Sequence, residues 1–143
     1  MSFFRTEVSF RGAKARVVES RLFSNPNKLV MARRPEVLAR VSRFDLGGLT
    51  VGEVISSGHD VDVTEYMANS LIVPLSGAIE CESKTGLVKA ATGEALFFSP
   101  NRRHTRVSAG KAPMFKGVPL IISTDLMRAA FDRLGLGLPA AIE

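Results

Sequence analysis

The sequence predicts a mainly β fold, an antiparallel sandwich or barrel, and three features between residues 44 and 137 indicate it. Short runs of β-branched and aromatic residues follow one another, and several of them alternate with polar residues. Gly, Asn or Pro separates these runs at short intervals, as in successive hairpins. A Ser-Thr-Asp sequence at 123–125 then opens an amphipathic segment, which is typical of a helix N-terminus.

The first 43 residues are expected to supply one or two strands and a short helix that pack on the β domain. Val8 and Phe10 alternate with polar neighbours, and the Ser-Asn-Pro-Asn sequence at 24–27 indicates a turn. Pro35 suits the first position of a helix, and apolar residues at positions 37, 38, 41 and 44 continue a narrow stripe at helical spacing.

Eight strands are then expected, at residues 49–55, 61–66, 70–75, 78–84, 87–92, 95–98, 105–108 and 114–122. Gly86 can supply the positive φ of a hairpin turn at 84–86. Pro74 interrupts an apolar run, which predicts an edge position or a bulge.

The C-terminal helix is expected to end near Gly135 and Gly137, and residues 138–143 to form a short tail. Its apolar face is expected to pack on the β domain, and such a helix could also form a homodimer contact. This face consists of Leu126, Met127, Ala130, Phe131 and Leu134.

Charge is distributed unevenly along the chain, whose net charge is +5. Residues 1–43 carry ten Lys or Arg and three acidic residues, a net charge of +7, and residues 44–143 carry −2. A basic segment could meet nucleic acid or an acidic protein surface. A solvated face is the favoured interpretation, because no helix-turn-helix pattern or interleaved aromatic residues accompany the charge.

Cys81 is the single cysteine, so the chain cannot form an intramolecular disulfide, which fits a cytoplasmic location. The first 15 residues lack the apolar run of a signal peptide, and no apolar run is long enough to span a membrane. Glu80 and Glu82 flank Cys81 and would raise its pKa, which argues against a nucleophile. The sequence also lacks a nucleophile elbow and a phosphate-binding glycine loop.

Two glycine-anchored stretches carry the most specific pattern. The first runs from Gly58 to Gly77 and the second from Gly93 to His104, with fifteen residues between Gly77 and Gly93. This spacing resembles the two motifs of the cupin superfamily, which are small antiparallel β-barrels of the jelly-roll type.

The resemblance implies four metal-ligand positions, which here are Thr64, Tyr66, Ser70 and His104. Cupin enzymes use two His and one Glu at the first three positions, so three of the four residues cannot serve as the usual ligands. We therefore expect no metal and no other cofactor, and binding rather than catalysis.

The motif register predicts that these four side chains point into one barrel interior. Thr64 and Tyr66 differ by two positions and must share a face of their strand. A slip of one residue would bury Glu65 without an evident partner, so the register that keeps Glu65 in water is preferred. Arg106 shares the strand parity of His104 and could meet a carboxylate or phosphate on a ligand, or remain solvated.

The order of elements over residues 44–137 narrows the resemblance. The 71–77 strand, the second motif, the Leu-Ile-Ile strand at 120–122 and the helix opened by Ser-Thr-Asp-Leu-Met look like the ligand-sensing, arabinose-binding-like domain of AraC-type transcription regulators. The resemblance implies a homodimer that binds a small-molecule effector. Promoter DNA would be bound by a helix-turn-helix domain that is absent from these residues, and we expect the chain to be a fragment of a longer regulator.

Two other functions stay open at this point. The chain could be a degenerate cupin enzyme, an isomerase or dioxygenase, which bound iron or manganese would favour. It could instead be a pure oligomerisation module whose barrel is filled with side chains. A solvent-connected cavity would favour the sensor.

Overall fold

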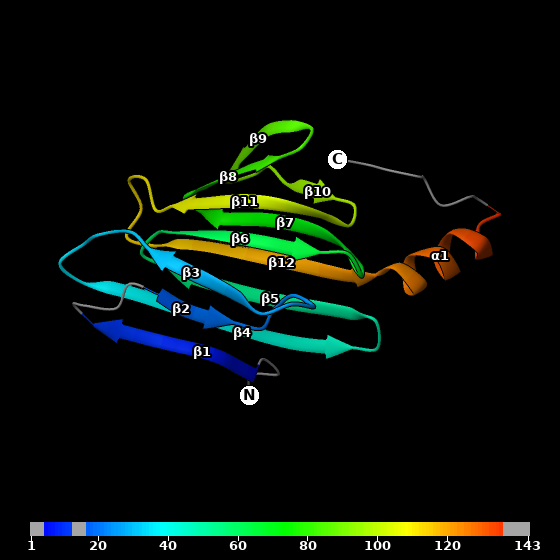
Figure 1. Cartoon of the computed structure of the whole chain (residues 1–143), viewed down its shortest axis with the longest axis horizontal. Helices are drawn as coiled ribbons and strands as arrows, with labels where there is room; N and C mark the ends of the chain where they lie inside the picture. The colour runs from blue at the N-terminus through cyan, green and yellow to red at the C-terminus, as the bar shows by residue number, and fades with distance from the viewer. Residues whose placement is uncertain (1–4, 13–16, 136–143) are drawn as a thin grey trace.

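The computed structural model describes residues 5–12 and 17–135, which form two six-stranded antiparallel sheets stacked face to face, with one helix (Figure 1). The first sheet has the order β1 (Arg5–Gly12), β4 (Val37–Leu46), β5 (Leu49–Ser56), β12 (Phe115–Ser123), β7 (Ala68–Ser76) and β10 (Leu96–Phe98). The second has the order β2 (Val17–Ser20), β3 (Asn27–Met31), β6 (His59–Glu65), β11 (Asn101–Ser108), β8 (Ala78–Ser83) and β9 (Gly86–Ala91). The predicted mainly β class is confirmed.

The hydrophobic core lies between the two sheets and follows the two-residue period of the strands. Leu29 on β3 and Val61 on β6 face Val41 on β4 and Ile121 on β12 in one cluster of buried residues. A second cluster fills the other part of the interior, with Phe98 of β10 and residues of β7, β8, β9, β11 and β12. Within the described residues no ladder joins the sheets, so the architecture is a jelly-roll sandwich.

The expected short helix near Pro35 is wrong, because this segment forms strand β4. Val37, Ala39 and Val41 point into the core and are at most 1% exposed. Residues 37 and 41 of the expected helical stripe also fit a two-residue alternation once Ala39 is counted as apolar. Ala39 was not counted because its side chain is small. Pairing with β1 on one side and β5 on the other stabilises the extended conformation.

The predicted turns are confirmed. A two-residue turn joins β8 to β9, with Ser83 paired to Gly86, whose φ is +134°. Pro74 lies opposite Gly117 where the register of β7 and β12 shifts, as expected for a strand proline. Gly77 has a φ of +83°, and a Cβ there would lie 2.2 Å from the Ser108 carbonyl oxygen, so a side chain would collide with the backbone.

The basic N-terminal segment is part of both sheets. It supplies β1 to the edge of the first sheet and β2 and β3 to the second, and β4 spans the predicted boundary between residues 43 and 44. Removing residues 1–43 would therefore remove three strands and most of a fourth.

The predicted C-terminal helix is α1 (Thr124–Arg133), which extends beyond one end of the sandwich (Figure 1). The hydroxyl of Ser123 caps it by accepting a hydrogen bond from the Leu126 N–H at 3.1 Å. Its first turn is joined to the β6–β7 turn, because the Thr124 N–H donates to the Met67 carbonyl at 3.1 Å.

The expectation that this helix covers the β domain differs from the structure. No residue of α1 is buried, and Leu126 and Leu134 are 39% and 73% exposed. The apolar stripe of α1 (Leu126, Met127, Ala130, Phe131 and Leu134) is thus only partly covered: Met127 and Phe131 are half-buried, and the other three residues are exposed.

Candidate functional site

Strands β6 and β11 pair side by side, and their alternation decides which side chains enter the interior. Glu65 pairs with Asn101, and Val63 pairs with Arg103; all four are buried, so this parity faces the first sheet. The other parity faces outward and contains Asp60, Asp62 and Thr64 on β6 and Arg102, His104 and Arg106 on β11.

The predicted register is therefore wrong by one residue for three of the four motif positions. Tyr66 is 60% exposed, Thr64 and His104 lie on the outer face, and Ser70 alone is inside, with no exposed surface. Arg106, predicted to share the parity of His104, does so, and it is also exposed on the outer face.

The physical reason is that Glu65 has partners that the preferred register did not foresee. One carboxylate oxygen accepts hydrogen bonds from the Ser24 N–H at 2.9 Å and the Ser24 hydroxyl at 2.8 Å. The other oxygen accepts a bond from the Met67 N–H at 3.0 Å. These bonds offset the cost of burying the carboxylate, so the interior can accept it.

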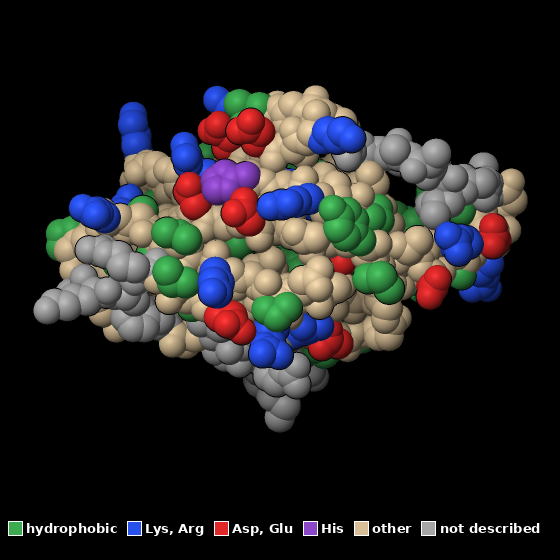
Figure 2. Space-filling model, viewed as in Figure 1, with side chains coloured by type: hydrophobic (Ala, Val, Ile, Leu, Met, Phe, Trp, Pro, Cys, Tyr) green, Lys and Arg blue, Asp and Glu red, His purple; other side chains and the backbone are tan. Residues whose placement is uncertain are grey.

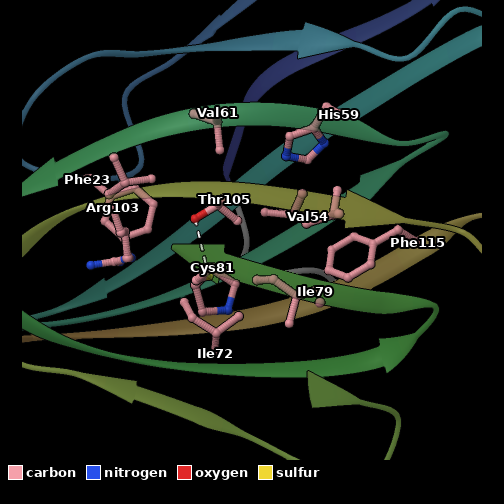
Figure 3. Close-up of a pocket in the computed structure, with 14 residues that line it drawn as sticks. Phe23, Val54, His59, Val61, Ile72, Ile79, Cys81, Arg103, Thr105 and Phe115 are labelled. Atoms are coloured by element: carbon pink, nitrogen blue, oxygen red, sulfur yellow. Dashed lines mark hydrogen bonds between the residues drawn. The ribbon is translucent and has the colours of Figure 1, made fainter. Parts of the chain in front are cut away.

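A cavity of about 70 Å³ lies between the sheets and is lined mostly by apolar side chains (Figure 3). Val61, Ile72, Ile79 and Phe115 contribute to its walls. Counted as space open to the centre of a water molecule, a single water needs roughly 10–15 Å³, so the cavity has room for about five water-sized groups. This size suits a very small organic molecule or several waters.

Arg103 lies at one end of this cavity, beside Phe23 (Figure 3). It is 3% exposed, and its Nη1 donates to the Asn101 Oδ1 at 2.7 Å. The guanidinium carbon is 4.3 Å from the ring centroid of Phe98 and 5.4 Å from that of Phe23, which are cation–π distances. Burial lowers the pKa of Arg103 to about 10, an effect partly offset by the nearby Cys81 and Glu65, so the guanidinium is charged at neutral pH.

Three buried side-chain atoms have no hydrogen-bond partner among the described residues, and of their residues only Arg103 lines the cavity. They are the Nη2 of Arg103, the Nδ2 of Asn101 and the Oγ of Ser70. Strand pairing places their residues at the same end of the sandwich. Ser70 pairs with Phe98, whose ring contacts the guanidinium, and Asn101 is bonded to Arg103 directly.

His59 lies toward the other end of the cavity, near Phe115 (Figure 3). Its Nδ1 is 2.8 Å from the Ser56 hydroxyl. Burial lowers the pKa of His59 to about 4, partly offset by the Asp60 carboxylate, so its ring is neutral at physiological pH. This end of the cavity therefore carries no positive charge from His59.

Cys81 lies between the two ends of the cavity, 3.3 Å from the Thr105 hydroxyl (Figure 3). Burial raises the pKa of its thiol, which agrees with the expectation that Cys81 is not a nucleophile.

His104 takes part in an ion network on the outer face of β6 and β11. Its Nδ1 is 2.8 Å from Asp62 and its Nε2 is 3.2 Å from Asp60, which also accepts from Arg106 at 3.2 Å. Figure 2 shows a histidine among acidic and basic side chains on this face. The hydrogen bond to Asp62 raises the pKa of His104. Among residues 5–12 and 17–135, no group of three or more His, Cys, Asp or Glu side chains is arranged to hold a metal ion.

Within the part of the chain that the structure describes, no helix is long and apolar enough to cross a membrane.

No protein-family model and no curated protein sequence matches the chain. Solved structures do match it. The AraC-like transcriptional activator CuxR superposes with a TM-score of 0.56 at 15% identity, over 69% of this chain and 38% of the activator. A cupin 2 conserved barrel domain protein from Salinispora arenicola gives 0.51 at 13% identity, and a cupin superfamily protein from Desulfitobacterium hafniense gives 0.51 at 15%. Each of these two comparisons covers 66% of this chain and 84% of the other.

The chain has a cupin fold. The two glycine-anchored stretches thus indicated the fold correctly. The chain spans only 38% of the length of the AraC-like activator, so the match concerns one part of that protein.

Sequence reasoning missed Arg103 as a site residue, although the sequence contains a signal for it. Along β11 the odd positions carry Asn101, Arg103, Thr105 and Val107, and the even positions carry only Arg, His and Ser. The single apolar residue, Val107, belongs to the odd set, and this indicates which parity faces the core.

Proposed function

We propose that this cupin-fold chain is the ligand-sensing and dimerisation domain of an AraC-like transcription regulator, and that its ligand occupies the cavity beside Arg103. The observation that carries the proposal is the cavity itself, of about 70 Å³. Larger apolar side chains at the lining positions would have filled this space, because side chains fill the rest of the core at close packing. A module used only for oligomerisation has no need of a cavity with buried polar groups at one end.

The chemistry of the lining favours binding over catalysis. Burial raises the pKa of Cys81 and lowers the pKa of His59 to about 4, so the thiol is protonated and the imidazole is neutral near pH 7. General acid–base catalysis works best with a group whose pKa lies near the working pH. The described residues of the lining therefore offer apolar contacts and the Arg103 side chain for binding a molecule, and neither Cys81 nor His59 has a pKa suited to acid–base catalysis.

The AraC-like part of the proposal rests on the fold and on the order of its elements. The superposition on CuxR covers 69% of this chain. The helix that follows the last strand in the sensory domains of that family has its counterpart in α1, whose stripe residues Leu126, Ala130 and Leu134 are exposed. Such a stripe fits a homodimer contact. Sequence-specific DNA binding would belong to a separate domain of the regulator, so the present chain should bind duplex DNA only weakly and without sequence preference.

A binding screen with a cavity-filling variant tests the sensory role. The 143-residue chain is heated with a panel of small alcohols, amides, carboxylates and sugars, and an increase in Tm reports binding. Val61→Phe narrows the cavity and should abolish the increase. Val30→Phe is the matched control, since Val30 is 52% exposed on the neighbouring strand β3 and lies outside the cavity.

A sensor must also couple binding to assembly. A compound that raises Tm should change the dimer dissociation constant measured by sedimentation, because a ligand shifts an equilibrium only by its different affinity for the two states. A panel in which no compound raises Tm, or in which Val61→Phe leaves every increase unchanged, would refute the sensory role of this cavity.

A further inference from the structure

The two sheets have different outer faces. On the second sheet, charged side chains occupy outward positions, with Asp60, His104 and Arg106 in the ion network of β6 and β11. On the first sheet, β7 and β12 contain consecutive apolar residues, Leu-Ile-Val at 71–73 and Leu-Ile-Ile at 120–122, so outward positions are apolar as well as inward ones. Continuous apolar runs of this kind are typical of strands that are buried on both faces.

Strand pairing aligns outward apolar residues in a row across the first sheet. Val51 on β5 pairs with Leu120 on β12. Leu120 also pairs with Leu71 on β7, which pairs with Phe97 on β10. Directly paired residues share a face of the sheet, and this face is the outer one, because Ile121, the neighbour of Leu120, is buried in the core. All four residues of the row are half-buried, so each keeps exposed surface within the described part of the chain.

A second row lies on the same face and leads to α1. Leu46 on β4, which is 52% exposed, pairs with Leu49 on β5, and Leu49 pairs with Ile122 on β12. The Ser123 N–H donates to the Gly48 carbonyl oxygen at 2.7 Å, so the start of α1 is held beside the turn between β4 and β5. This row therefore borders the apolar stripe of α1.

The outward residues of β5, β7, β10 and β12, here called the outer apolar face, are numerous enough for one side of a protein–protein contact. Four strands about 4.8 Å apart span about 19 Å, and the nine residues of β7 extend about 30 Å, so the face covers roughly 500 Å² in projection. This is near the upper end of what monomeric proteins expose in one apolar patch, roughly 300–600 Å². The apolar stripe of α1 extends it toward the roughly 800 Å² per partner of a standard interface.

The charges on the outer apolar face favour a second copy of the same chain as its occupant. At the outward positions of these four described strands, Glu53 on β5 and Lys116 on β12 are the charged residues, so the face has no net charge although the chain carries +5. Neither forms an ion pair among the described residues. In a two-fold contact the same surface meets itself, so each copy presents a charge of the opposite sign to both groups. A neutral face also lacks the positive charge that nucleic acid requires.

We propose that the outer apolar face is a dimer interface, against which a second copy of the chain packs sheet to sheet, with the apolar stripe of α1 continuing the contact at one end. This inference rests on the proposed function, because it assigns the homodimer of that function to a definite surface. Two sheets packed face to face lie about 10 Å apart and bury the side chains between them. The charged outer face of the second sheet then stays in water, while the apolar face of the first sheet does not.

Sedimentation equilibrium of the whole chain over a range of concentrations tests the inference. The unchanged chain should dimerise, and Leu71→Lys should weaken the dimer at least about 100-fold, because it buries an unpaired charge in the contact. Leu46→Lys should weaken it at least about 10-fold, and this exposed position should keep the fold even if Leu71→Lys does not. Val30→Lys is the matched control, since Val30 is 52% exposed on the outer face of the second sheet, and it should leave the dimer unchanged.

A thiol probe reports on the same surface without adding a charge. Cys81 is the single cysteine of the chain and is 1% exposed, so Leu71→Cys would supply an accessible thiol against a low background. Its reaction with a maleimide should slow at least about 10-fold as the protein concentration rises above the dimer dissociation constant. Val30→Cys is the control and should react at the same rate at every concentration.

The outcomes separate this inference from the sensory role of the cavity. A chain that stays monomeric, or a dimer that both Leu71→Lys and Leu46→Lys leave intact, would overturn the proposed interface. A dimer that dissociates in Leu134→Lys but not in Leu71→Lys would also overturn it, because the contact would then be confined to α1. If Leu71→Lys dissociates the dimer and no compound of the panel binds in a manner sensitive to Val61→Phe, the interface stands and the sensory role of the cavity fails.

Discussion

Ser24 holds the buried carboxylate of Glu65 through two hydrogen bonds, one from its N–H at 2.9 Å and one from its hydroxyl at 2.8 Å. The two residues are 41 positions apart, so a turn of the basic N-terminal segment completes the polar end of the interior. Because these bonds satisfy its carboxylate oxygens within the chain, Glu65 can remain fully buried between the sheets.

Ser24→Ala should therefore lower the free energy of unfolding by about 1–3 kcal/mol, since it removes one of the bonds to a fully buried carboxylate. Urea denaturation measures the change. Thr92→Ala is the control, because Thr92 is exposed in the turn after β9 and surface substitutions usually change stability by less than about 0.5 kcal/mol. Equal effects of the two substitutions would show that the Ser24 hydroxyl does not stabilise the carboxylate.

Stability should depend on pH through His59. Its pKa falls from 6.5 in the unfolded chain to about 4 in the folded one, so the unfolded state binds more protons between these values. The stabilising contribution is fully present above about pH 6.5 and is lost as the pH falls toward 4. Unfolding free energy should accordingly drop by roughly 1.5 kcal/mol between about pH 6.5 and 5, as measured by urea denaturation at several pH values.

The chain has only two histidines, so the assignment can be made with two variants. His59→Gln should remove this slope. His104→Gln should leave it in place, because the pKa of His104 is raised and its stabilising contribution is lost as the pH rises, the opposite direction. A slope that survives in His59→Gln would contradict the assignment.

The purified chain should contain no stoichiometric transition metal. The two ring nitrogens of His104 already bond to Asp62 and Asp60. Thr64 and Tyr66 offer no nitrogen, sulfur or carboxylate ligand, and Ser70 lies inside the sandwich, away from the outer face of His104. A zinc or iron site needs three or more converging nitrogen, sulfur or carboxylate ligands. Elemental analysis that found about one iron, manganese or zinc per chain, lost in His104→Ala, would overturn this prediction and favour a cupin enzyme.

Self-association should depend on the apolar stripe of α1. Leu134→Lys places a charge on a side chain that is 73% exposed, so the monomer should keep its stability while the dimer dissociates at least about 10-fold more readily. Sedimentation equilibrium measures the dimer constant. Leu87→Lys is the control, because Leu87 is also exposed, at 51%, but lies on β9. A dimer unaffected by Leu134→Lys would require a different interface.

Most of the strand pattern could be predicted from local sequence, because period-two alternation and turn residues act over short distances. Strand β5 and the β8–β9 hairpin lie close to the predicted ranges, and Ser123 caps α1 as expected. Strand β4 was predicted as a helix because Ala39, with its small side chain, was not counted among the apolar residues. With Ala39 included, residues 37, 39 and 41 form the regular alternation of a strand, and all three are buried.

The orientation of the site could not be predicted from the motif spacing, because it depends on a partner far away in sequence. The preferred register kept Glu65 in water, and only the folded chain brings Ser24 to its carboxylate. Arg103 was missed for a related reason. The motif alignment placed His104 in the interior, so its neighbour Arg103 was expected on the outer face of the strand. The general rule, that a buried charge needs partners, was sound, but the sequence does not reveal which partners arrive.

The start of α1 lies close to Ser70, a fully buried residue of β7. Ser70 pairs directly with Ile121 on β12, and the helix cap Ser123 follows Ile121 by two residues, about 7 Å of extended strand. No flexible linker separates the two, so a ligand in the cavity that shifts β7 at Ile72 would also act on β12, the strand that carries α1. A single β-strand thus connects an occupied cavity to the helix through which two copies would meet. A spin label on α1 could measure how far the helix moves when a ligand binds.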